Sequence, residues 1–92
     1  MNLDLNAAVY NGKSYKLRPS EAVMLFTLRK RWPYTVPHEE MIHALWGANG
    51  SPSWANMIMS VQAAHIRKRL NGSGARVVSQ YGEGYRLELG AI

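Results

Sequence analysis

The chain has 92 residues, of which 47% are hydrophobic and 18% are charged, a balance typical of one globular domain and not of a disordered segment. It has no cysteine, which excludes disulfide frameworks and thiolate metal sites, and its apolar runs are far too short to span a membrane. Eleven Lys and Arg against six Asp and Glu give a net charge of +5, which favours a polyanionic partner, and the absence of a secretion signal predicts a cytoplasmic location.

Residues 1–18 predict a small antiparallel sheet. Short apolar pieces are separated by polar residues from Leu3 to Leu17. Between two of these pieces stand Asn11 and Gly12, a dipeptide that strongly indicates a two-residue hairpin turn. We therefore expect the chain to begin with paired strands.

Two helices are predicted next. Ser20 can cap the first one and Pro33 ends it, so we expect a helix at residues 20–32. Pro37 suits the first turn of a second, shorter helix, which we expect at residues 37–46.

Residues 54–70 predict a third and longer helix. Four apolar side chains recur at helical spacing and should form one buried stripe: Met59, Ala63, Ile66 and Leu70. The opposite face carries small residues beside basic ones, which lets a helix approach a groove closely. Two strands around Gly82 and Gly84 then predict a hairpin at residues 76–89.

The order of sheet, three helices and hairpin predicts an α+β fold with the winged helix-turn-helix layout over residues 1–92. Four segments also resemble the OmpR/PhoB-type winged-helix domains, which are the DNA-binding halves of many bacterial response regulators: Leu17 to Glu21, Met41 to Gly47, Val61 to Leu70 and Gly82 to Leu87. The resemblance implies a bacterial or phage transcription regulator with a recognition helix in the major groove and a wing at the minor groove. There is no room for a receiver domain, so phosphorylation is not the expected switch unless the chain was excised from a longer protein.

The expected DNA contacts come from the outer face of the third helix, from the end of the second helix and from the wing. They are Ser60, Val61, Gln62, Ala64, His65, Arg67 and Lys68, then Trp46, and finally Tyr81, Tyr85 and Arg86. Arg67 and Lys68 can reach base edges or phosphates, although they could also be a solvated helix end. For Tyr85 and Trp46 the alternative is a packing role.

A protein-interaction module that docks on RNA polymerase or on another regulator is the alternative function. Trp54 and Met57 lie near the junction of the second and third helices, where the resemblance implies a loop for RNA polymerase. An exposed tryptophan there would indicate a partner contact, but we expect burial. Binding of single-stranded RNA is disfavoured because no sheet motif carries aromatic residues for base stacking.

Catalysis, cofactors and metal binding are not expected. The chain has one aspartate, no cysteine and no recognisable Ser-His-carboxylate grouping. His38 and His43 are five residues apart, so on a helix they would point about 140° away from each other. Because the chain also lacks a heptad run, we expect a monomer in solution that pairs only on DNA.

Overall fold

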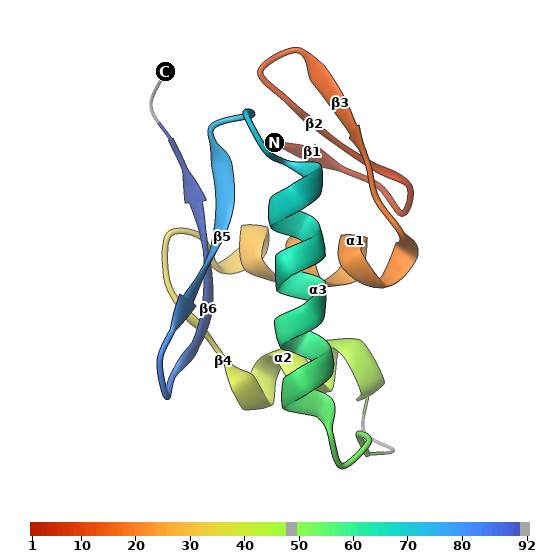
Figure 1. Ribbon diagram of the computed structural model, residues 1–92, viewed down its shortest axis with the longest axis vertical. Helices are drawn as coiled ribbons and strands as arrows, with labels where there is room; N and C mark the ends of the chain where they lie inside the picture. The colour runs from red at the N-terminus through yellow and green to blue at the C-terminus, as the bar shows by residue number, and fades with distance from the viewer. Residues whose placement is uncertain (48–49, 91–92) are drawn as a thin grey trace.

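The computed structural model describes residues 1–47 and 50–90. In these ranges the N-terminal sheet contains β1 (Asn2–Leu3), β2 (Ala7–Tyr10) and β3 (Lys13–Lys16), in that order. The helices are α1 (Pro19–Arg31), α2 (His38–Trp46) and α3 (Ala55–Arg69). The second sheet has the order β4 (Val36–Pro37), β6 (Gly84–Leu89) and β5 (Ala75–Gln80), and both sheets are antiparallel (Figure 1). This architecture confirms the predicted α+β winged-helix class.

The N-terminal sheet is shaped by two local turns. Between β1 and β2 the Asp4 carboxylate accepts hydrogen bonds from the backbone N–H groups of Asn6 (2.7 Å) and Ala7 (2.8 Å), and it thereby closes the turn. Between β2 and β3, Asn11 and Gly12 have positive φ angles of 53° and 79°. A two-residue hairpin turn of type I′ needs positive φ at both positions. The predicted hairpin is confirmed.

The start of α1 corrects one expectation, because Ser20 does not cap this helix. The residue before the first turn is Arg18, and its backbone N–H donates to the carboxylate of Glu21 (3.0 Å). Pro19 occupies the first helical position, where its fixed φ fits and its missing N–H costs nothing. Glu21 therefore satisfies the N–H of the residue before the helix, while Ser20 is exposed in the first turn.

The short strand β4 was not predicted. Pro37 was expected inside the first turn of α2, but it pairs with Gly84 of β6, and Val36 pairs with Tyr85. A Cβ atom on Gly84 would overlap the backbone carbonyl of Val36, so only glycine fits at this crossing. The strand ties the segment before α2 to the C-terminal hairpin.

The hydrophobic core lies where α1, α2 and α3 meet the second sheet. The predicted stripe of α3 is confirmed, since the side chains of Met59, Ala63, Ile66 and Leu70 are all buried. The rest of the chain supplies the remaining large buried apolar side chains: Leu17, Met24, Leu25, Leu28, Val36, Met41, Val77, Tyr85 and Leu87. None of the helices in residues 1–47 and 50–90 combines the length and the apolar character needed to cross a bilayer.

Candidate nucleic-acid interface

The exposed face of α3 has other parts of the chain on both sides. In Figure 1, α3 stands in front of α1 and α2, with the β5–β6 hairpin on one side and the junction of β3 with α1 on the other. The exposed side chains along this face are Asn56, Met57, Ser60, Val61, Ala64, His65, Arg67 and Lys68. Most are uncharged, and those at its centre are small. Asn56 was missed by the sequence analysis, and its one available signal was its spacing of four residues from Ser60.

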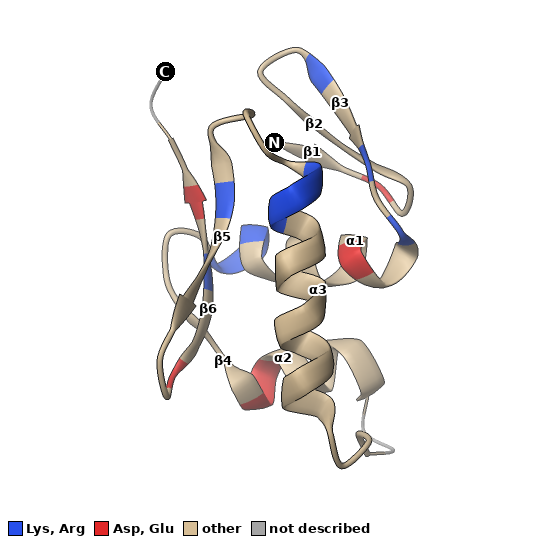
Figure 2. Cartoon of the chain, viewed as in Figure 1, with Lys and Arg blue, Asp and Glu red and all other residues tan. Residues whose placement is uncertain are grey.

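Positive charge flanks this face and is scarce along its centre. The basic residues of α3 all lie in its last turn, and its first turn has no acidic residue. Figure 2 shows further Lys and Arg residues on β5 and at the junction of β3 with α1. Acidic residues appear at the tip of the hairpin, on β6, near the start of α1 and at the start of α2. The charge pattern leaves an uncharged helix face with basic groups at its end and on both sides.

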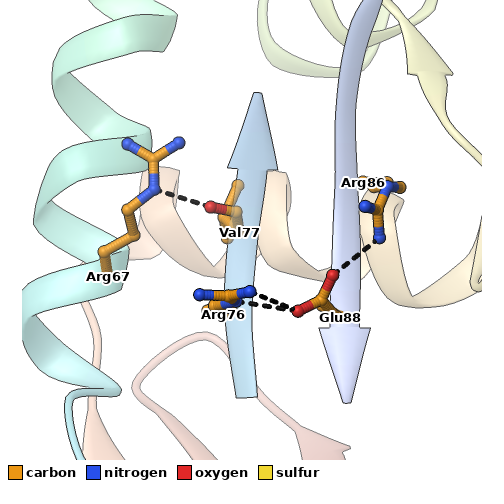
Figure 3. A network of polar contacts seen from close by, with 5 residues as sticks. All are labelled: Arg67, Arg76, Val77, Arg86 and Glu88. Atoms are coloured by element: carbon orange, nitrogen blue, oxygen red, sulfur yellow. Dashed lines mark hydrogen bonds and ion pairs between the residues drawn. The ribbon is translucent and has the colours of Figure 1, made fainter. Parts of the chain in front are cut away.

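Arg67 is exposed as predicted, but its side chain also bonds to the hairpin. Its Nε–H donates to the backbone carbonyl of Val77 (2.6 Å), so the side chain lies against β5 (Figure 3). The periodicity of α3 could not show this, because the acceptor belongs to a strand ten residues further along the chain. The bond links the last turn of α3 to the hairpin.

Arg69 and His65 both lie beside the carboxylate of Glu21. This glutamate is 1% exposed, which makes it a buried charge. Arg69 Nε is 2.5 Å from its Oε1, and His65 Nδ1 is 3.7 Å from its Oε2. A buried carboxylate needs such a partner to offset its loss of hydration. The pair therefore joins the start of α1 to the end of α3.

The three wing residues that were predicted to contact DNA have different surroundings. Tyr81 is fully exposed in the turn. Tyr85 is 4% exposed and packs edge to face against His38, with 5.6 Å between ring centroids, so the prediction that it faces DNA is replaced by a core role. Arg86 is half-buried and its Nη1 donates to Glu88 (3.0 Å), which occupies part of its hydrogen-bonding capacity.

Glu88 joins two arginines on the outer surface of the hairpin. Hydrogen bonds from Arg76 (2.8 Å) and then from Arg86 hold the pKa of the Glu88 carboxyl below its ordinary value (Figure 3). The pKa of Glu88 is lower in the folded state than in the unfolded state. The stability that its two ion pairs contribute is therefore present above the ordinary glutamate pKa, and it is lost as the pH falls through the pKa of the folded state.

We expect the NMR titration of the Glu88 carboxyl carbon to show a midpoint below that of an ordinary glutamate. Arg76→Gln should raise the midpoint toward the ordinary value, because the hydrogen bond from Arg76 is the largest cause of the shift. Arg86→Gln should raise it by less. Equal midpoints in the wild type and in Arg76→Gln would contradict the assignment.

The other predicted residues that lie off the centre of the α3 face differ in burial. Trp46 is half-buried and packs against the core, which favours the packing role. Trp54 and Met57 are 60% and 68% exposed, so the expected burial of Trp54 is wrong. Gln62 has a buried Oε1 atom that finds no hydrogen-bond partner within residues 1–47 and 50–90.

Comparison with known proteins gives no sequence-level match, because no family model and no curated protein matches the chain. Solved structures do match. The DNA-binding domain of Bacillus subtilis CssR is 19% identical with a TM-score of 0.69, over 85% of this chain and 86% of that one. The C-terminal domain of the nisin resistance regulator NsrR, a lantibiotic response regulator, is 21% identical with a TM-score of 0.72, over 94% and 88%.

The DNA-binding domain of Escherichia coli CadC is also similar, with 17% identity and a TM-score of 0.67 over 96% of this chain and 83% of that one. Identities this low relate the folds and not the contact residues. The resemblance to OmpR/PhoB-type domains is thus confirmed for the architecture.

Proposed function

We propose that this chain, which has the fold of the OmpR/PhoB-type winged-helix DNA-binding domains, is a sequence-specific transcription regulator that binds duplex DNA. In this proposal α3 enters the major groove, the β5–β6 hairpin lies at the adjacent minor groove, and two monomers pair on repeated half-sites. The observation that carries the proposal is the exposed α3 face, whose small residues Ser60, Val61 and Ala64 lead to Lys68. A face of this kind can approach base edges closely, and a cation at its end can meet the phosphates.

Two further features support a DNA partner. The net charge of +5 favours a polyanion. Tyr81 is fully exposed in the hairpin turn and can lie against a sugar or a phosphate. The acidic Glu83 in the same turn is a feature against close contact by the whole tip.

Binding of wild-type protein to random duplex should weaken steeply with salt, with a log–log slope of about −0.9 for each neutralised phosphate. Ser60→Glu should weaken binding about tenfold or more, because the carboxylate would face the negatively charged duplex from the middle of the α3 face. Ser14→Glu is the matched control, since Ser14 is exposed on β3 of the N-terminal sheet. A flat salt response, or equal losses in both variants, would argue against this function.

The exposed pair Trp54 and Met57 favours a second candidate, a module that docks on RNA polymerase or on another regulator. Exposed large apolar side chains that lie close together mark protein contacts more often than chance positions do. Mapping of NMR shifts separates the two functions. Duplex DNA must perturb residues 60–68, whereas a protein partner could act through Trp54 and its neighbours alone.

A further inference from the structure

A basic hollow of about 280 Å³ lies between the start of α1 and the last turns of α3, lined by Arg18, His65, Lys68 and Arg69. We propose that this hollow seats one phosphate of the DNA backbone, with Arg18 and Lys68 as its cations and the His65 ring as a further hydrogen-bonding group. The proposal rests on the proposed function. It adds to that function a contact from the segment before α1, which the recognition helix and the wing do not include.

The charges around the hollow leave two cations available. Arg69 is engaged by the Glu21 carboxylate at 2.5 Å, and Glu21 is 1% exposed, so its negative charge lies beneath the surface. The backbone N–H of Arg18 donates to the same carboxylate, but the Arg18 residue itself is exposed. In the part of the chain that the structure describes, neither Arg18 nor Lys68 takes part in an ion pair.

The place of the hollow matches the geometry of a duplex. The hairpin lies on one side of α3, tied there by the bond from Arg67 to Val77, and the junction of β3 with α1 lies on the other side (Figures 1 and 2). A helix in the major groove has a phosphate backbone on each side of it. The hairpin can meet one backbone, and the hollow faces the side on which the other would run.

The chemistry of the hollow fits a phosphate group. Arginine offers a planar fork of N–H donors that suits the tetrahedral arrangement of phosphate oxygens, and lysine adds a compact charge. A small phosphorylated molecule would use the same donors. The shared ligand chemistry is therefore a phosphate group, and the duplex backbone is the source to which the proposal commits.

The first experiment measures duplex binding by Arg18→Gln across a salt series. The log–log slope should become shallower by about 0.9, so that the ratio of wild-type to variant affinity falls roughly 3.5-fold between 50 and 200 mM salt. The loss at any one salt concentration should be the same for every duplex sequence, since a phosphate contact carries no base information. Arg29→Gln is the matched control, because Arg29 is exposed near the opposite end of α1, and its slope should equal that of the wild type.

Thermal unfolding of Arg18→Gln should match that of the wild type, because the backbone N–H that donates to Glu21 is retained. Should this variant unfold, Lys68→Gln gives the same measurement. If the salt dependence of Arg18→Gln has the same log–log slope as that of the wild type, the hollow does not bind a phosphate, and the proposed function is unaffected. If the wild-type protein itself binds no duplex, the proposed function fails and the duplex-backbone seat fails with it.

The second experiment titrates inorganic phosphate into the free protein and follows the NMR signals of the Arg18 guanidinium and the His65 ring. If the hollow binds a phosphate of the DNA backbone, free phosphate should cause only weak, non-saturating shifts, because the affinity for that phosphate comes from the rest of the duplex. Saturation at sub-millimolar phosphate would overturn the duplex source in favour of a free phosphorylated ligand.

Discussion

Replacing Arg69 by methionine is expected to lower the free energy of unfolding by about 3 kcal/mol, because the Glu21 carboxylate would stay buried without its ionic partner. Glu21 is 1% exposed, whereas the Arg69 side chain is 30% exposed, which places the effect at the lower end of the range for buried pairs. Urea unfolding measured by circular dichroism gives the value. The same arginine-to-methionine change at Arg76, whose pair with Glu88 is solvent-exposed, should cost much less than the change at Arg69.

A double-mutant cycle separates loss of the pair from loss of packing. Glu21→Leu combined with Arg69→Met removes both charges, and apolar replacement of a buried pair is often neutral. The double variant should therefore be more stable than Arg69→Met alone, and it should retain only the cost of losing the carboxylate that accepts from the Arg18 N–H. Additive effects of the two changes would show that the pair is not coupled.

Gly84→Ala is expected to cost about 3 kcal/mol, because the new Cβ atom would collide with the Val36 carbonyl and force β4 away from β6. Backbone atoms on both strands define this collision, so no side-chain rotation relieves it. The change in unfolding free energy and the loss of the cross-strand NOE between Val36 and Tyr85 should appear together.

Gly82→Ala separates a steric effect from a conformational one. Gly82 has a φ of 74°, but nothing lies within 4 Å of a Cβ built there. Its substitution should cost only about 1 kcal/mol, which is the strain of an L-residue in the left-handed region. If Gly84→Ala proves no more destabilising than Gly82→Ala, the collision with the Val36 carbonyl is not the cause of the loss of stability.

The parts of the fold that follow from local rules were predictable from the sequence. The turn at Asn11 and Gly12 and the buried stripe from Met59 to Leu70 depend only on neighbours in the chain, and both are present. β4 was not predictable, because two residues carry no periodicity and one of them is a proline. Its partners on β6 come from the far end of the sequence, so its pairing depends on tertiary structure.

The candidate site divides in the same way. Helical spacing alone places Ser60, Ala64 and Lys68 on an exposed face. It places Arg67 there too, and the structure turns that side chain toward a carbonyl on β5. The buried partner of Arg69 lies 48 residues earlier, so no local pattern could assign it. The orientation of a long arginine side chain depends on partners that are distant in the sequence. A helical projection therefore predicts the orientation of arginines less well than that of shorter side chains.

The bond from Arg67 to Val77 holds α3 and the hairpin at one separation. Under the proposed function, two elements fixed to each other meet a duplex whose groove width and stiffness vary with its sequence. A duplex that does not present both grooves at the required spacing must bend or untwist to do so, and stiff sequences cost more to deform. Base pairs that the protein never touches would then influence the choice of site through the mechanical compliance of the DNA.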